Sequence, residues 1–281
     1  MASCNFLVQF CGEKEMGGDM RVDVLIQGFP GRSLCHGGLG WSTITLLRDT
    51  QRTVLIDVGA FGVRRELIKQ LRDHGVAPDA VTDVVLTHAH YDHSVNFTLF
   101  PNATPWIGDI ELEWAASQPP GFNPLPELYV QALAKDPRTR RIRGDQEFLP
   151  GLRAIPVPGH TPGGLLYLLE CPQRTLLFTG DSAKNRAELL SRDVDSSLDP
   201  VASRQSIDTI WALWRHRPGT VLVPGHDLCM VLDAEDQPVY LGERRAGIEA
   251  WFSESIASVA NIDLCCEPDP RARRQAWAWT D

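Results

Sequence analysis

Short apolar segments rich in β-branched residues alternate along the chain with fewer amphipathic segments. In the first half this pattern predicts strands over Val22–Gly28, Thr43–Arg48, Thr53–Asp57 and Asp83–Thr87. The apolar positions of Val63–His74 recur at helical spacing, and the stop signals Gly75 and Pro78 follow them. A helix between the third and fourth strands makes a β-α-β unit, which favours parallel pairing of those two strands.

The second half repeats this mixture after an irregular middle segment. Strands are predicted over Leu152–Val157, Leu165–Glu170, Thr175–Thr179 and Thr220–Val223, and helices over Val201–Arg215 and Leu241–Val259. This order predicts an α/β fold of the mixed α+β kind, with two halves whose sheets are covered outside by helices. We expect a single domain over residues 1–281, with a C-terminal helix and tail from about 241 to 281.

The middle segment, at about residues 106–144, is rich in aromatic residues and proline and is interpreted as an insert. It contains one predicted helix, Glu127–Lys135, and a basic run, Arg138–Arg143. A long irregular segment often forms a lid or a binding loop, and a surface excursion packed by its own aromatic residues is the alternative. As a lid it would give an apolar substrate pocket lined by Tyr91, Trp106, Trp114, Phe122 and Tyr129.

Composition and charge narrow the functional classes. The chain has 281 residues, of which 43% are hydrophobic and 22% charged, as in ordinary globular proteins. A net charge of −9 disfavours nucleic-acid and membrane-surface partners, and no apolar run approaches the roughly 18–20 residues of a membrane span. The start of the chain lacks the features of a signal peptide, and the seven cysteines form no C-x-x-C pair. These features predict reduced thiols and a cytoplasmic location.

The strongest chemical signal is the segment Thr87–His93, which follows a predicted buried strand. It places His88, His90, Asp92 and His93 within six positions, and imidazole and carboxylate groups are zinc-type ligands. In a loop after a strand, the first two side chains can reach one point and the last two a second point nearby. A polar surface loop is the alternative, which the concentration of three of the eight histidines here disfavours.

Three further predicted strands end in a glycine that is followed by one candidate ligand: His160, Asp181 and His226. A single glycine-histidine or glycine-aspartate pair is commonplace, but four ligand segments at strand ends indicate a built site. The set predicts metal-assisted hydrolysis, because a water shared by two divalent ions is deprotonated near neutral pH.

The H-x-H-x-D-H motif, His160, the Thr-Gly-Asp of Asp181 and the Pro-Gly-His of His226 together resemble the metallo-β-lactamase-fold hydrolase superfamily, over roughly Val22 to His226. The resemblance implies an αββα sandwich with a dinuclear site at one edge, supported by Asp57. It also implies two groups of metal ligands, with Asp181 as the bridge between the metals: His88, His90 and His160, and Asp92, His93 and His226. Zinc is the expected metal, with iron or manganese as the alternatives.

Several branches of this superfamily fit poorly. True β-lactamases typically lack the bridging aspartate, long nucleases insert a domain between the positions of Asp181 and His226, and flavodiiron proteins replace the second histidine of the motif with glutamate. The compact lactonases, glyoxalase-II-like thioesterases and small phosphodiesterases remain. The Leu25–Phe29 strand and the size also resemble a small group of metallo-β-lactamase-domain proteins of animals and bacteria.

Lys184 lies three residues after Asp181, where the quorum-signal lactonases that resemble this chain carry a tyrosine. A lysine there could stabilise an oxyanion or bind an anionic substrate, and a solvent-facing side chain is the alternative. Asp92 and Lys184 are the expected catalytic residues. The sequence therefore predicts a dinuclear metal-dependent hydrolase, in which a metal-bridging hydroxide attacks an ester-like C–O bond of a lactone, carboxylic ester or activated aryl ether. The predicted substrate is a compact, largely apolar small molecule.

Three other activities stay open. The basic run suits a phosphodiester or RNA hydrolase, or a glyoxalase-II-like thioesterase. A persulfide dioxygenase with a single iron shares the fold and most of these residues. Outside the site, Trp251, Trp277 and Trp279 suggest contacts in a homo- or hetero-oligomer, with simple packing as the alternative.

Overall fold

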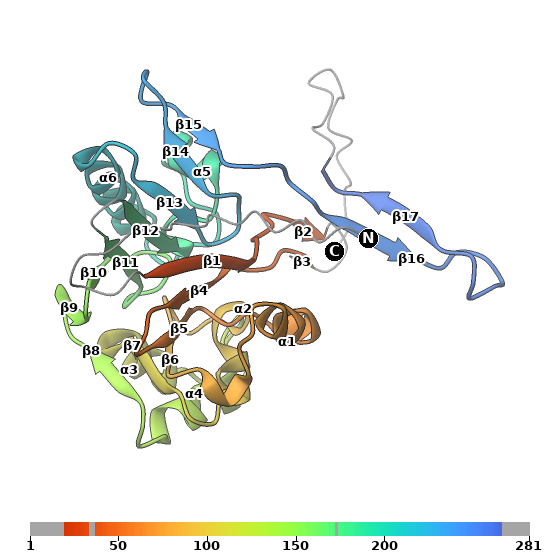
Figure 1. Cartoon of the computed structure of the whole chain (residues 1–281), viewed down its shortest axis with the longest axis horizontal. Helices are drawn as coiled ribbons and strands as arrows, with labels where there is room; N and C mark the ends of the chain where they lie inside the picture. The colour runs from red at the N-terminus through yellow and green to blue at the C-terminus, as the bar shows by residue number, and fades with distance from the viewer. Residues whose placement is uncertain (1–19, 34–36, 172–173, 266–281) are drawn as a thin grey trace. The chain divides into compact units, whose positions relative to one another are not determined.

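Segments rich in leucine and β-branched residues form two mixed sheets in the first of two compact units, Met1–Gly242 and Glu243–Asp281. The computed structural model describes residues 20–33, 37–171 and 174–265. The first sheet has the order β1 (Arg21–Ile26), β4 (Ile44–Arg48), β5 (Thr53–Ile56), β6 (Asp83–Val85), β7 (Thr104–Gly108) and β8 (Arg140–Ile142). The second has the order β15 (Pro238–Tyr240), β14 (Met230–Leu232), β13 (Val221–Pro224), β12 (Thr175–Gly180), β11 (Leu165–Glu170), β10 (Leu152–Pro156) and β9 (Gln146–Leu149) (Figure 1).

Parallel pairing occurs at the centre of both sheets. β5 pairs in parallel with β6, with Leu55 opposite Val84, and helix α1 (Arg64–Asp73) connects them, as the sequence predicts. β12 pairs in parallel with β13, with Leu177 opposite Leu222. Parallel strands end at a common edge of their sheet, so the loops that follow β5 and β6 in one sheet, and β12 and β13 in the other, can converge.

Helices cover the outer faces of both sheets (Figure 1). α1, α3 (Asp109–Ser117) and α4 (Glu127–Lys135) pack on the first sheet, and α5 (Arg186–Ser191) and α6 (Pro200–His216) pack on the second. The remaining short elements are α2 (Tyr91–Ser94), β2 (Arg32–Ser33), β3 (Gly37–Gly38) and the 3-10 turns Phe61–Val63, Pro78–Ala80, Val95–Leu99 and Asp181–Ala183. A third apolar cluster, which includes Val54 and Ile56 of β5 and Leu169 and Phe178 of the second sheet, fills the space between the sheets. The fold is therefore an αββα sandwich, the architecture that the resemblance implies.

Helix α6 shows how the sequence specifies these elements. The Asp199 carboxylate accepts hydrogen bonds from the backbone N–H groups of Val201 and Ala202, and Pro200 occupies the first helical position. Buried side chains then recur at helical spacing, ending at Trp214, whose indole donates to the Thr220 carbonyl. The indole thus joins the end of the helix to the start of β13.

The segment 106–144 is part of the sheet framework, so its description as an insert is wrong. β7 and β8 extend the first sheet in parallel, and α3 and α4 pack on that sheet. The sequence predicted α4 with its observed bounds but missed α3, because the exposed Ile110 breaks the apolar pattern of that helix.

The helix predicted over Leu241–Val259 is absent from the described part of the second unit, which forms a hairpin of β16 (Gly247–Ala250) and β17 (Ala260–Asp263). Side chains of β16 alternate between half-buried and exposed, a period of two that suits a strand. Trp251 is exposed beyond the end of β16. Trp277, Trp279 and the start of the chain lie outside the described residues. Within the described ranges, no helix combines the length and apolarity that crossing a bilayer requires.

Tyr167 of β11 gives a test of how the two sheets are joined. Its fully buried hydroxyl donates a hydrogen bond of 2.6 Å to the carbonyl of Leu86, in the segment after β6. We expect Tyr167→Phe to lower the free energy of unfolding by about 1–3 kcal/mol, because a buried carbonyl loses its partner. Urea denaturation at equal metal content measures the change. Tyr129→Phe, with no hydroxyl hydrogen bond among the described residues, should stay within about 0.5 kcal/mol of the parent, and equal effects of the two substitutions would contradict the assignment.

Candidate metal centre

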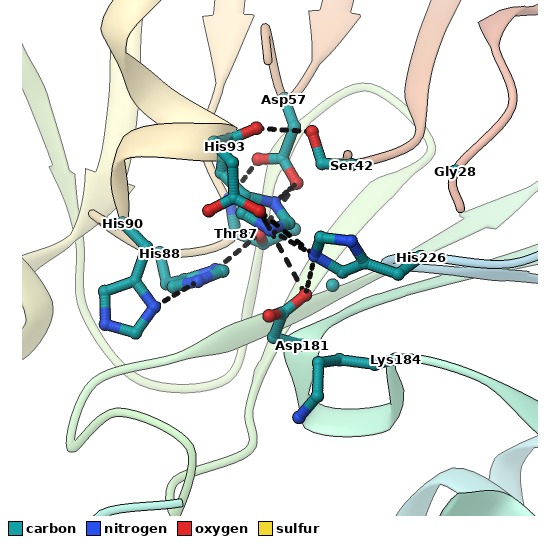
Figure 2. A network of polar contacts seen from close by, with 12 residues as sticks. Gly28, Ser42, Asp57, Thr87, His88, His90, His93, Asp181, Lys184 and His226 are labelled. Carbon is teal, nitrogen blue, oxygen red and sulfur yellow. Dashed lines mark hydrogen bonds and ion pairs between the residues drawn. The ribbon is translucent and has the colours of Figure 1, made fainter. Parts of the chain in front are cut away.

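The ligand-type side chains expected from the sequence meet at one site. Figure 2 labels five of them: His88, His90, His93, Asp181 and His226. His88 and His90 lie in the loop after β6, and Asp92 and His93 lie on α2 directly after it. The other three follow β10, β12 and β13, respectively: His160, Asp181 and His226. All are buried except Asp92, which is half-buried.

Three imidazoles form what we call the first ligand group: His88, His90 and His160. Nδ1 of His90 lies 3.0 Å from Nε2 of His88 and 2.9 Å from Nε2 of His160. Three nitrogen atoms this close can bind one ion at the usual zinc–nitrogen distance of about 2.0–2.1 Å.

The second ligand group consists of Asp92, His93 and His226. The Nε2 atoms of His93 and His226 are 3.3 Å apart, and Oδ2 of Asp92 lies 3.2 Å from Nε2 of His226. Two imidazoles and one carboxylate again converge on one point, which suits a divalent ion of the zinc type.

The carboxylate of Asp181 lies between the two groups. Its Oδ1 is 3.1 Å from Nε2 of both His93 and His226, and its Oδ2 is 3.3 Å from Nε2 of His160. Oδ1 is buried, so its negative charge needs a positive partner: the imidazolium groups of His93 and His226 in the metal-free protein, or a bound cation in their place. The residues present therefore fit divalent metal ions.

Asp57, which directly follows β5, orients the loop that carries the ligands. Its Oδ2 accepts hydrogen bonds from Nδ1 of His93 at 2.7 Å and from the hydroxyl of Thr87 at 2.8 Å, and its Oδ1 accepts from the backbone N–H of Thr87. Nδ1 of His160 likewise donates to the Ser196 carbonyl at 2.8 Å. Occupying Nδ1 leaves Nε2 free to bind a metal, and such contacts fix the orientation of the ring.

Burial and nearby carboxylates shift the pKa values of the imidazoles in opposite directions in the two ligand groups. Burial is the largest influence in the first group: it lowers the pKa of His90 to about 3 and that of His160 to about 4. In the second group burial also lowers the pKa, but nearby carboxylates, chiefly Asp181, outweigh it. They raise the pKa of His226 to about 9 and that of His93 well above its usual range. The metal-free site thus holds protons where the second group would hold a cation.

A pocket of about 260 Å³ opens beside the ligands and is lined by both Tyr91 and Lys184. Nζ of Lys184 is 2.9 Å from Oε1 of Glu188 and donates to the Asp195 carbonyl, and the side chain is 14% exposed. These contacts hold the side chain in place rather than extended into solvent, and in Figure 2 the Lys184 ammonium group points away from the metal ligands. Pro124, from the proline-rich segment that the sequence predicted to line the pocket, is also part of the lining. The lining further includes residues that the sequence did not single out: Pro30, Gly31, Arg32, Gly38, Leu39, Gly40, Asn185, Glu188, Asp195 and Ser196. For Glu188, the only available signal was its helical spacing of four from Lys184.

The expected aromatic wall is not found around this pocket. Trp106 donates its indole N–H to Asp83, Trp114 packs edge-on against Phe122, and Tyr129 packs against Phe61. The structure thus corrects the placement of Trp106, Trp114, Phe122 and Tyr129, since none of them lines the pocket. The basic run is also engaged elsewhere, because Arg141 and Arg143 both pair with Asp109.

Sequence comparison gives independent evidence of ancestry. A family model described as the metallo-beta-lactamase superfamily matches residues 37–226. A relative from Mus musculus, metallo-beta-lactamase domain-containing protein 1, is 31% identical over 200 residues, which are 69% of this chain and 67% of the relative. N-acyl homoserine lactonase AttM of Azorhizobium caulinodans is 31% identical over 175 residues, covering 57% of this chain and 63% of that protein.

Solved structures support the fold. An N-acyl homoserine lactone hydrolase with the product N-hexanoyl-L-homoserine bound at its catalytic metal centre matches 75% of this chain and 94% of its own, with a TM-score of 0.60 and 19% identity. AidC, a dizinc quorum-quenching lactonase, matches 72% of this chain and 80% of its own, with a TM-score of 0.61 and 18% identity. At these identities the likeness establishes the architecture.

The raised pKa of His226 predicts that metal binding releases protons. At pH 7 its imidazole is protonated in the metal-free protein, so binding Zn²⁺ should release about one proton from it and the affinity should rise with pH toward 9. Isothermal titration calorimetry in two buffers with different enthalpies of protonation measures the release. A binding enthalpy that does not depend on the buffer would contradict the prediction.

Proposed function

We propose that this chain, which belongs to the metallo-beta-lactamase superfamily and is a metal-dependent hydrolase, cleaves an ester-like C–O bond. In this proposal it uses two divalent ions, most simply zinc. The observation that carries the proposal is the Asp181 carboxylate, because its two oxygen atoms face different ligand groups. His88, His90 and His160 would hold one ion, and Asp92, His93 and His226 the other.

The proposed substrate is a compact lactone, carboxylic ester or activated aryl ether. Lactonases among the similar proteins favour this class, and the pocket of about 260 Å³ suits a small molecule. Because Arg32, Lys184 and Asn185 line the pocket, we propose a substrate with polar groups in addition to the scissile bond. The cytoplasmic location and the oligomer expected from the sequence stay predictions.

Divalent ions held by these ligands would supply Lewis acidity, which lowers the pKa of a water molecule and polarises the oxygen of the substrate. Asp92 lines the same pocket, where its carboxylate would hold the second ion or orient that water and accept its proton. Lys184 lines the same pocket, where its ammonium group would stabilise negative charge that develops on the substrate. Glu188 and the Asp195 carbonyl fix the position of that group in advance.

Metal content tests the bridging role of Asp181. We expect about two ions per active chain, and we expect Asp181→Ala to weaken the binding of both ions by at least about tenfold, because each loses a ligand. Competition with a chelator, followed by elemental analysis, measures this. Asp208→Asn is the matched control, because Asp208 is an exposed aspartate on α6, outside the pocket and both ligand groups. A fully active chain with a single ion would refute the bridge, and a single iron would favour the dioxygenase alternative.

Turnover tests the role of Asp92. Asp92→Asn keeps the size of the side chain but removes its charge, so we expect kcat to fall by about 100-fold or more. The assay uses a lactone and a p-nitrophenyl ester on metal-loaded protein, again with Asp208→Asn as the control. Near-normal kcat in Asp92→Asn would show that the carboxylate does not act in the reaction.

The bond class is decided by assaying a lactone, an ester, a thioester and bis-p-nitrophenyl phosphate at low and high salt. Ester or lactone turnover that depends little on salt supports the proposal. Phosphodiester cleavage that falls steeply with salt, without ester turnover, would replace it with the phosphodiesterase alternative.

A further inference from the structure

Glu111, near the start of α3, is a fully buried acid outside the ligand set. Charged side chains are almost never buried without a partner, because transferring an ion out of water is costly. Burial raises the pKa of Glu111 to about 7. Among the described residues no ion pair involves this carboxylate, so its position needs another explanation.

Two backbone N–H groups from the ligand loops meet this carboxylate. The N–H of Ala89, between His88 and His90, donates to Oε1 at 2.9 Å. The N–H of Gly163, three residues after His160, donates to Oε2 at 3.2 Å. One side chain therefore joins the two chain segments that carry the first ligand group.

The packing around Glu111 leaves no room for a side chain at two neighbouring glycines. A Cβ atom at Gly163 would lie 2.1 Å from the backbone nitrogen of Glu111, and a Cβ atom at Gly108 would lie 2.7 Å from the carbonyl oxygen of Gly163. The backbone of the His160 loop thus lies directly against the start of α3. Both glycines make this approach sterically feasible.

We propose that Glu111 is a positioning residue, which holds the His88–His90 segment and the His160 loop at the separation that the first ligand group requires. This inference rests on the metal assignment of the proposed function. It accounts for the buried acid, because only a carboxylate offers acceptor oxygens to both N–H groups at once. A glutamine would turn an NH₂ group toward one of them and leave two donors facing each other.

The test compares the two ligand groups within the same protein. In a His226→Ala background the first group is intact, and in a His160→Ala background the second group is intact. We expect Glu111→Gln to weaken Zn²⁺ binding by about 10–100-fold in the first background, the usual range for a lost contact behind a ligand, and by less than about twofold in the second. Competition with a chelator gives the affinities, independently of any enzymatic assay.

Glu113→Gln is the matched control, because Glu113 is an exposed acid on the same helix. It should leave Zn²⁺ affinity unchanged in both backgrounds. Near-UV circular dichroism of the metal-free proteins reports folding. If Glu111→Gln does not fold, Glu111→Asp is measured by the same criterion, because it keeps both oxygen atoms but is too short to reach both amides.

Equal weakening in both backgrounds would overturn the inference, since it would indicate a general loss of structure. Unchanged affinity in both would also overturn it. Failure of the unsubstituted chain to bind Zn²⁺ would instead remove the proposed function, so the two failures can be told apart.

Discussion

The site depends on the burial of the Asp181 carboxylate among imidazole nitrogen atoms. Burial raises the pKa of this carboxyl, but the imidazoles of His226, His93 and His160 outweigh that effect and hold it well below its usual range. Space for the carboxylate comes from the opposing strand ends, since a Cβ atom at Gly225 would lie 2.4 Å from Oδ1. Gly180, at a φ of +49°, packs against Thr87 in the same way, so the two sheets meet closely at the metal edge.

Hydrogen bonds behind the ligands hold these charged and polar side chains in position. Asp57 fixes His93, the Ser196 carbonyl fixes His160, and Glu111 joins the backbones of two ligand loops. Each contact comes from an element of the rigid sandwich or from a loop packed on it. Ligands held this way are preorganised, so a metal ion meets them without reordering flexible chains.

Much of the fold was predictable because its elements follow the periodicities of helices and strands. α1, α4, α6 and the strands that end at the ligands carry strong patterns, and the ligand motif places His88, His90 and His93 together by local spacing alone. The aromatic residues gave a wrong prediction of the pocket wall, because Trp106 and Trp114 fill apolar space in a core as readily as they line a pocket. Glu111 carries no sequence signal, because a glutamate on a helix normally faces water and only the packing of distant loops shows otherwise.

The Lys184–Glu188 pair affects how the pocket could select a substrate. Both side chains are largely buried, and the carboxylate lies 2.9 Å from the ammonium nitrogen. A paired ammonium attracts distant anions less than an isolated one, since the field of its partner opposes its own. Its remaining donor capacity acts at short range and in a fixed direction, because Glu188 and the Asp195 carbonyl already occupy part of it. If Lys184 binds the substrate as proposed, it would therefore recognise an oxygen atom at a defined position rather than the net charge of the substrate.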